Sequence, residues 1–420
     1  MRVVHVLRKY NPAEWGGTET AIQRLFEGLR QHHVTTVAYC PRITNNFGAD
    51  PLVEAGFTVK RFRAFMPVWG ISRERHRQLV AVGGNLMSLD LPARLLSERE
   101  VAVMHTHTLG RLGGIALMTA RLRRVPFIMT IHGGLLDLPA ALKQSFRNPH
   151  AGGVEWGKAF GAVLRTRRLL QCADAVITCN QREASLLKAR HPNKRIVVQP
   201  HGVPTSLFRK DHREAAHEAF SLIRGKRLLL AVGRIDPVKN QHWLIEQAPE
   251  LFRRHSDVVL VLPGACTHEA YGRLIKERID QLGLQNRVLL AGGLPPSDAR
   301  LIGLFQSAEA IVLPSISETF GLVILEAWAA GTTVISSRTS GALDLIRQGE
   351  NGWFFDLDSP RTFHEAVDSV LLNPEVRMRQ TAAGGKLVRA EFDTTVLAGR
   401  MKNLYSGVIE ERHALRGSAR

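Results

Sequence analysis

Short apolar runs alternate with longer helix-forming stretches along most of the chain. Each run is bounded by polar or glycine-containing segments, which suits a strand buried on both faces of a parallel sheet. The runs are Val3–Leu7, Val34–Tyr39, Phe57–Val59, Val101–His105, Phe127–Ile131, Ala175–Cys179, Ile196–Gln199, Arg227–Val232, Val258–Leu262, Arg287–Leu290, Ala310–Leu313 and Thr332–Ser336. Because strands that alternate with helices form sheets covered on both faces, the pattern predicts an α/β fold with two doubly wound sheets.

The composition is that of a soluble globular protein large enough for two cores. The chain has 420 residues, of which 45% are apolar and 22% charged, and both shares are ordinary. The first ten residues lack the apolar region of an export signal, and no run of 18 apolar residues follows. Cys40, Cys172, Cys179 and Cys266 show no metal-binding spacing. Reduced thiols in a cytoplasmic protein are therefore expected.

The positive charge is concentrated in the first half of the chain. The net charge is +18, and residues 1–200 hold 29 Lys and Arg against 13 Asp and Glu. Such a basic half predicts anionic partners. The clusters lack the aromatic interleaving and the motifs of nucleic-acid-binding domains, so an anionic membrane surface or a phospholipid-linked acceptor is favoured over nucleic acid. A basic face that is merely solvated is the structural alternative.

One segment combines the strand, loop and helix pattern with two carboxylates. Residues 314–331 read PSISETFGLVILEAWAAG and follow the predicted strand Ala310–Leu313. Glu318 falls in the loop at the carboxyl end of that strand, where open α/β sheets bind ligands. Glu326 stands among apolar residues of the predicted helix, so its carboxylate needs hydrogen-bond donors to offset the loss of water. The hydroxyl groups of a ligand would supply such donors.

Two structural explanations compete with a ligand site in this segment. Ser315–Glu318 has the spacing of a capping box, in which Glu318 would only complete a helix end. Glu326 could form a structural ion pair with a distant arginine. Phe320 and Gly321 favour the ligand, since a glycine at a helix N-terminus lets the backbone approach an anion. Together these residues favour a sugar-nucleotide site.

Two further loops carry groups suited to phosphate. Arg234 and Lys239 follow the predicted strand Arg227–Val232 and lie five residues apart on one loop. Two such cations can straddle a diphosphate, because arginine offers a fork of donors and lysine a point charge. Gly16 and Gly17, between the first strand and its helix, would let the backbone come close to a ligand.

Two histidines follow predicted strands directly. His107 comes after Val101–His105, and His132 comes after Phe127–Ile131 and precedes two glycines. Open sheets place site residues at such strand ends, and a histidine there can exchange protons near neutral pH. A strand-end ring bonded to the backbone is the structural alternative, and the residues alone leave it open.

These motifs resemble those of a known family. The spacing of Glu318 and Glu326 resembles the Glu-x7-Glu signature of the family 4 retaining glycosyltransferases, and Arg234 with Lys239 resembles that family's Gly-Arg…Lys motif. His132 is similar to the histidine of its His-Gly loop. His201 departs from the pattern, because the family has asparagine in the corresponding turn. The resemblance covers nearly the whole chain, strongly in the second half.

The resemblance implies the GT-B fold, in which each of the two domains binds a different substrate. Two Rossmann-like domains would face a central cleft, with residues 1–204 binding the acceptor and residues 205–392 binding the nucleotide sugar. Residues 393–420 would form a helix that crosses back to the first domain, followed by a basic tail. The implied catalytic residues are His132, Arg234, Lys239 and Glu318. The implied donor-binding residues are Gly16, Gly17, Arg234, Lys239, Gly264, Leu294, Glu318, Phe320, Gly321, Leu322 and Glu326.

The family mechanism sets expectations for cofactors. The developing charge on the leaving diphosphate would be stabilised by Arg234, Lys239 and the amides near Phe320–Leu322. Glu318 would bind sugar hydroxyls and Glu326 the ribose. In a front-face mechanism the leaving phosphate itself accepts the proton of the acceptor. Neither a metal nor another cofactor is expected.

The function expected from the resemblance is retaining hexosyl transfer. The donor would be GDP-mannose or a UDP-sugar, and the acceptor a glycan or a polyprenyl-pyrophosphate-linked glycan. The basic first half suggests work at the cytoplasmic face of the membrane, in the assembly of bacterial lipopolysaccharide or exopolysaccharide. The alternatives are a GT-B epimerase, a glycogen-type synthase, and a membrane- or nucleic-acid-binding protein with a degenerate site.

Overall fold

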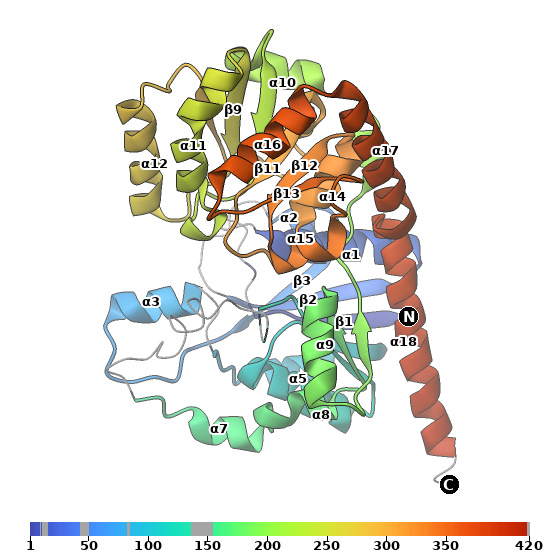
Figure 1. Ribbon diagram of the computed structural model, residues 1–420. Helices are drawn as coiled ribbons and strands as arrows, with labels where there is room; N and C mark the ends of the chain where they lie inside the picture. The colour runs from blue at the N-terminus through green and yellow to red at the C-terminus, as the bar shows by residue number, and fades with distance from the viewer. Residues whose placement is uncertain are drawn as a thin grey trace. The chain divides into compact units, whose positions relative to one another are not determined.

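The chain folds into two compact units, which we describe separately. The computed structural model describes residues 1–8, 10, 16–42, 50–81, 85–134, 136 and 154–417 (Figure 1). The first unit contains Met1–Pro200 together with Thr395–Arg420, and the second contains His201–Thr394. In the described part of the chain, no helix has both the length and the apolar character needed to cross a membrane.

The first unit is built on a seven-stranded parallel sheet. Its strand order is β3-β2-β1-β4-β5-β6-β7, so the direction of winding reverses between β1 and β4. The strands are β1 (Arg2–Val6), β2 (Thr35–Arg42), β3 (Thr58–Arg63), β4 (Val101–Thr106), β5 (Phe127–Ile131), β6 (Ala175–Thr178) and β7 (Ile196–Val198). The sheet is mostly apolar because helices cover both of its faces.

Helices of the first unit pack on this sheet around separate clusters of apolar side chains. They are α1 (Gly17–Gln31), α2 (Pro51–Glu54), α3 (Arg73–Ala81), α4 (Leu91–Ser97), α5 (Gly110–Leu122), α7 (Lys158–Val163), η2 (Thr166–Arg168), α8 (Leu169–Cys172), α9 (Gln181–Arg190) and α18 (Thr394–Gly417). One cluster joins Val3, Val103 and Ile128 of the sheet to Ala398 and Tyr405 of α18. The last helix of the chain therefore completes the core of the first unit.

The second unit repeats the architecture with six parallel strands in the order β10-β9-β8-β11-β12-β13. The strands are β8 (Arg227–Leu230), β9 (Val258–Pro263), β10 (Val288–Gly292), β11 (Ala308–Leu313), β12 (Thr333–Ser337) and β13 (Trp353–Phe355). The helices are η3 (Thr205–Phe208), α10 (Arg213–Ala219), η4 (Ser221–Ile223), η5 (Pro237–Lys239), α11 (Gln241–Arg254), α12 (Glu269–Gln281), α13 (Ala299–Ser307), α14 (Leu322–Ala330), α15 (Ser340–Leu345), α16 (Pro360–Leu371) and α17 (Pro374–Glu391). The predicted α/β class with two doubly wound sheets is confirmed.

Candidate active site

The winding of the second sheet reverses between β8 and β11, and the loops after these two strands carry the predicted charged residues. The β8 loop holds Arg234 and Lys239, and the β11 loop holds Glu318. The Ile316 amide donates to the Val238 carbonyl over 2.9 Å, which joins the two loops. Because parallel strands end at the same edge, the fold gathers these groups at the place where open α/β sheets bind ligands.

Lys239 and Glu318 form an ion pair in this region. The Lys239 ammonium donates to a carboxylate oxygen of Glu318, and the two side chains are 21% and 22% exposed. The Asp236 carboxylate accepts from the Val238 amide and shapes the turn that carries Lys239. Arg234 is exposed at the other end of the loop. The structure thus brings Lys239, which is predicted to bind phosphate, into direct contact with Glu318, which is predicted to bind the sugar.

The helix that follows Glu318 begins at Leu322, six residues after the start that a capping box of Ser315 and Glu318 requires. Its N-cap is Gly321, with φ +93° and ψ 54°, in the left-handed region that favours glycine. Glu318 therefore does not cap this helix, and the capping-box alternative is wrong. A glycine N-cap has no side chain to bond to the first helical amides, and such a helix start suits an anion.

Glu326 lies in the middle of α14 and is buried, as its apolar neighbours predict. Its side chain belongs to a residue that is 8% exposed, between Leu325 and Ala327, which are fully buried. Trp328 on the same helix anchors α14 by donating from Nε1 to the Asn351 carbonyl over 2.9 Å. The carboxylate is thus held on a rigid element, as selective binding of hydroxyl groups requires.

Phe320 is buried just before α14 and packs on two aromatic side chains of the second unit. Its ring centroid lies 5.1 Å from that of His201 in an edge-on arrangement and 6.4 Å from that of Phe392. His201, which stands where the family has asparagine, therefore contributes an aromatic contact to the loop before α14.

Gly264 is needed for close packing of the loops after β8 and β9. A Cβ atom at this position would lie 1.9 Å from the Gly233 carbonyl oxygen. The Gly264 amide donates to the Gly292 carbonyl over 2.7 Å, and the Gly233 amide donates to Pro263 over 3.1 Å. Leu294 is half-buried in the loop after β10. The predicted contacts of Gly264 and Leu294 with the donor remain predictions. Packing against Gly233 is by itself enough to require a glycine at position 264.

The first unit has the corresponding reversal between β1 and β4. Gly16 is the N-cap of α1, and Gly17 is its first residue. Trp15, which precedes them, lies outside the described residues. His132 follows β5 and is partly buried, and the pKa of its imidazole is lowered to about 4 by burial and then by the positive charge of Arg8. The ring is therefore neutral at pH 7.

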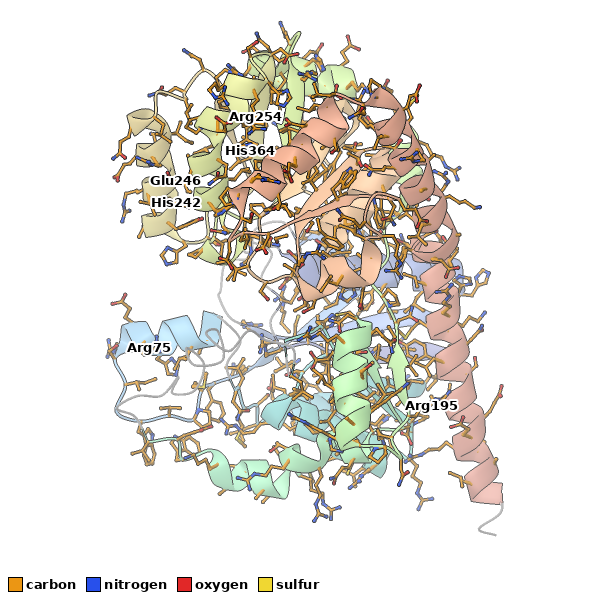
Figure 2. All side chains as sticks on the ribbon, viewed as in Figure 1. Arg75, Arg195, His242, Glu246, Arg254 and His364 are labelled. Carbon is orange, nitrogen blue, oxygen red and sulfur yellow. The ribbon has the colours of Figure 1, made fainter. Side chains whose placement is uncertain are left out.

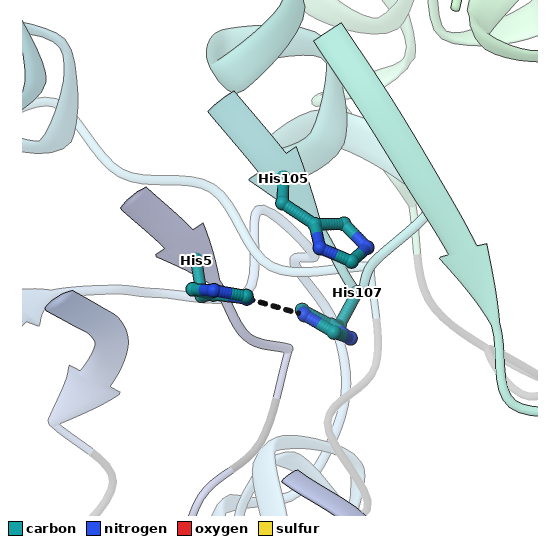
Figure 3. Close-up of side chains that lie close together, drawn as sticks. All are labelled: His5, His105 and His107. Atoms are coloured by element: carbon teal, nitrogen blue, oxygen red, sulfur yellow. Dashed lines mark hydrogen bonds between the residues drawn. The ribbon is translucent and has the colours of Figure 1, made fainter. Parts of the chain in front are cut away.

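His132 is connected to two further histidines of the first sheet. Its Nε2 lies 2.8 Å from Nδ1 of His107, and Nε2 of His107 lies 2.9 Å from Nδ1 of His5 (Figure 3 shows His5 and His107). His5 occurs within the apolar run Val3–Leu7, and the sequence around it gives no sign of a site. The alternative in which the strand-end rings bond only to backbone is wrong for His107 and His132.

Two family models match the chain and together span most of it. The model described as "Glycosyl transferase 4-like domain" matches residues 16–202. The model described as "Glycosyl transferases group 1" matches residues 212–387.

Several relatives that share one name match much of the chain. The D-inositol 3-phosphate glycosyltransferase of Corynebacterium glutamicum is 26% identical over 353 residues, which are 82% of this chain and 80% of the relative. The protein of the same name from Frankia alni is 31% identical over 324 residues, 76% of this chain and 75% of the relative. Several further relatives are matched over only 60 to 66% of their own length.

The fold is also that of solved structures. HepE of Anabaena, crystallised in complex with UDP, aligns with a TM-score of 0.72 at 17% identity, over 97% of this chain and 100% of that protein. At this level of identity the likeness concerns the GT-B fold, which agrees with the two sheets described above.

Proposed function

Because the chain belongs to the glycosyl transferases group 1 family, we propose that it transfers a hexose from a nucleotide diphosphate sugar to a phosphate-bearing acceptor. The observation that carries the proposal is the charge arrangement where the second sheet reverses its winding. Lys239 and Glu318 are in contact there, and Glu326 is buried on the helix that follows. One ligand with an anionic diphosphate and hydroxyl-rich rings on both sides satisfies all three groups.

The proposed roles follow from the chemistry of each group. Arg234 and Lys239 neutralise the diphosphate, and the N-terminus of α14 adds its amides and its dipole. Glu318 exchanges its contact with Lys239 for hydroxyl groups of the sugar. Glu326 accepts from the ribose hydroxyls, which offset the desolvation of its carboxylate.

We further propose that the configuration at the sugar carbon is retained and that no metal takes part. Arg234 and Lys239 supply two positive charges where the leaving diphosphate develops negative charge, which is the task a metal ion performs in other transferases. The leaving phosphate then accepts the proton of the acceptor hydroxyl. We assign His132 of the first unit a part in the reaction as a neutral imidazole.

The surface of the first unit supports an anionic membrane as a partner. Phe65, Trp69, Trp156 and Phe160 form a connected aromatic group with ring centroids 5.7 to 6.0 Å apart. Trp69 is 67% exposed. We call these four side chains the aromatic patch. Aromatic rings at a surface, with basic residues nearby in the chain, are typical of binding at a lipid interface.

Exposed basic side chains lie near the residues of the aromatic patch in sequence. They are Arg73 and Arg75 on α3, and Lys158, Arg165, Arg167 and Arg168 on and after α7 (Arg75 is labelled in Figure 2). A polyprenyl-pyrophosphate-linked glycan, as used in bacterial surface polysaccharide assembly, fits this surface. The name of the relatives points instead to an inositol phosphate. Both acceptors carry phosphate, which agrees with the basic first half.

A product assay tests this proposal and separates the acceptors. The full chain is incubated with UDP-glucose, UDP-N-acetylglucosamine or GDP-mannose, together with inositol 3-phosphate or a polyprenyl-pyrophosphate-linked sugar. We expect one pair to give a product whose anomeric configuration, read by NMR, matches that of the donor, with equal rates in EDTA. Inversion of configuration would contradict retention, and loss of activity in EDTA that is restored by a divalent metal would contradict metal independence. Donor consumption without a product that depends on acceptor would favour another sugar-nucleotide enzyme.

A further inference from the structure

The loop that carries His132 is joined to a buried carboxylate on a neighbouring element of the first unit. The chain leaves β5, passes His132 and reaches Leu136, whose backbone amide donates to Oε1 of Glu183 over 2.8 Å. Glu183 lies in the first turn of α9, 47 residues further along the chain. Because β5 and β6 are neighbouring parallel strands, the loop after β5 lies beside the start of the helix that follows β6.

The backbone directly after His132 contains two glycines in the left-handed region. Gly133 has φ 96° and Gly134 has φ 76°, so the chain can turn sharply at this point. Glycine has no side chain to pack against the sheet and leaves the backbone more freedom than other residues do. The loop therefore needs contacts further along the chain to hold one conformation. Leu136 provides them through its amide and through its side chain, which packs on the apolar cluster that includes Ile131.

Glu183 is held firmly enough to serve as the fixed end of this contact. The residue is fully buried, and its amide donates to Oδ1 of Asn180 over 2.7 Å. The Thr178 hydroxyl, at the end of β6, donates to the Asn180 carbonyl over 3.1 Å. A carboxylate removed from water needs hydrogen-bond donors to offset the cost of its desolvation. The Leu136 amide meets part of this need, and in return the carboxylate holds the loop.

A capping box is the purely local explanation of Glu183. Asn180 is the N-cap of α9 and Glu183 stands three residues later, which is the spacing of that motif with asparagine in place of serine or threonine. In a capping box the glutamate bonds back to the N-cap amide and stabilises its own helix. The motif does not require a contact with a loop 47 residues earlier in the chain. The hydrogen bond from Leu136 therefore points to a role outside α9.

We infer that Glu183 is a positioning residue, which keeps the loop after β5 in the conformation that presents His132. The part of His132 in the reaction rests on the proposed function, whereas the placement of the loop is a property of the first unit alone. Replacing Glu183 by an apolar residue would take this acceptor away from the Leu136 amide and allow the loop to shift. A displacement of about 1 Å at a reacting group can lower a rate roughly 100-fold.

NMR spectra of the full chain labelled with 13C-histidine test the placement of His132 without any substrate. The spectrum of His132→Gln identifies the ring signal of His132 by its loss. We expect this signal to move in Glu183→Leu, which removes the acceptor, and to stay near its wild-type position in Glu183→Gln, which removes only the charge. Glu98→Gln, the matched control, changes a buried carboxylate that pairs with Arg2 at the amino end of β1, and it should leave the signal in place. The thermal midpoint of each variant establishes that it is folded.

Activity in single and double variants separates positioning from stability. Glu183→Leu should lower the rate of transfer by roughly 100-fold, and Glu183→Gln, which keeps an acceptor oxygen, should recover most of it. The affinity for the donor should stay that of the wild type, because Arg234, Lys239 and Glu326 belong to the second unit. Adding Glu183→Leu to His132→Gln should cause no further loss of rate, since a positioning residue acts only through the residue that it holds.

Two results would overturn the inference. One is an unshifted His132 signal in folded Glu183→Leu, which would leave Glu183 as a capping residue of α9. The other is a loss of rate from Glu183→Leu that is equally large with and without His132→Gln. Absence of transfer in the wild type, together with the expected shift of the His132 signal in Glu183→Leu, would count against the proposed function only.

Discussion

The first prediction concerns single residues and follows from the contact between Lys239 and Glu318. A diphosphate must compete with the Glu318 carboxylate for the Lys239 ammonium. We therefore expect Glu318→Gln to bind a free nucleoside diphosphate as tightly as the wild type or several-fold more tightly, because the competing charge is gone. The same variant should transfer sugar far more slowly, since it loses a strong acceptor for the sugar hydroxyls. Calorimetric titration and the product assay measure the two effects.

A second ion pair of the same unit provides the control for this variant. Arg377 donates to Glu309, away from the β8 and β11 loops. Glu309→Gln should leave both affinity and rate unchanged. Weaker binding of the nucleoside diphosphate to Glu318→Gln would show that Glu318 supports the diphosphate site rather than competing with it.

The chemistry of single residues could be predicted only where the neighbours in sequence determine it. Glu326 is flanked by apolar residues of a helix, so its burial follows from the sequence. His5 could not be singled out, because one histidine in the run VVHVL is indistinguishable from a polar residue of an ordinary strand. Its contact with His107 depends on the pairing of β1 with β4, which is separated from it by about 100 residues.

The next prediction concerns structural elements and follows from the tight packing of the loops after β8 and β9. Gly264→Ala would place a methyl group against the Gly233 carbonyl, so the loops after β8 and β9 must separate. Gly283 is the matched control, because it has φ +65° and open space around the added Cβ. Gly283→Ala should cost about 1–2 kcal/mol of unfolding free energy through backbone strain alone.

We expect Gly264→Ala to lower the unfolding free energy by more than this amount and to weaken donor binding as well. Urea denaturation and calorimetric titration provide the two measurements. Equal losses of stability in the two variants would mean that the loops can move apart freely, and that the close approach of Gly233 and Gly264 is unimportant.

The elements themselves were largely predictable, but their ends were not. The run Val3–Leu7 corresponds to β1, and Ala310–Leu313 lies within β11. The spacing of Ser315 and Glu318 fits a capping box, yet the helix starts only after Gly321, because the left-handed conformation of that glycine turns the chain first. Capping boxes depend on backbone geometry that spacing alone does not determine.

At the scale of the whole molecule, the buried histidines make stability depend on pH. Burial lowers the pKa of His5 and His105 well below 6.5, with further lowering by neighbouring histidines, and the pKa of His132 is lowered to about 4. Below pH 6.5 the unfolded chain binds protons that the folded chain does not. The free energy of unfolding should therefore fall as the pH drops from about 6.5 to about 4, by up to about 1.4 kcal/mol per pH unit for each buried histidine.

The carboxylates change the free energy of unfolding at lower pH than the histidines do. Burial acts to raise the pKa of Glu98, but hydrogen bonds from Lys60, Tyr39 and Arg2 outweigh it and lower the pKa to about 2. Its contribution to stability is lost only below its unfolded pKa of about 4.5. Urea denaturation between pH 4.5 and 6.5 thus reports on the histidines. His105→Gln should reduce the slope, and an unchanged slope would contradict the assignment.

The aromatic patch and the basic residues near it in sequence predict binding to anionic vesicles. Flotation should increase with the content of anionic lipid and fall with salt, because exposed charges are screened. Trp69→Ser should weaken binding, and Arg73→Ser with Arg75→Ser should weaken it by about thirtyfold, at about 1 kcal/mol for each arginine. Leu372→Ser, which changes a side chain of the second unit that is 64% exposed, is the control. Binding that is independent of anionic lipid would contradict this prediction.

Donor binding by wild type and Glu326→Gln tests the central claim most directly. Calorimetric titration with UDP-glucose, UDP-N-acetylglucosamine and GDP-mannose should identify a donor for the wild type. Its affinity should fall about tenfold in Glu326→Gln, since a charge-assisted hydrogen bond to the ribose becomes a neutral one. Glu365→Gln, on the exposed side of α16, should bind like the wild type. Equal affinities in Glu326→Gln and the wild type would contradict the proposed donor site.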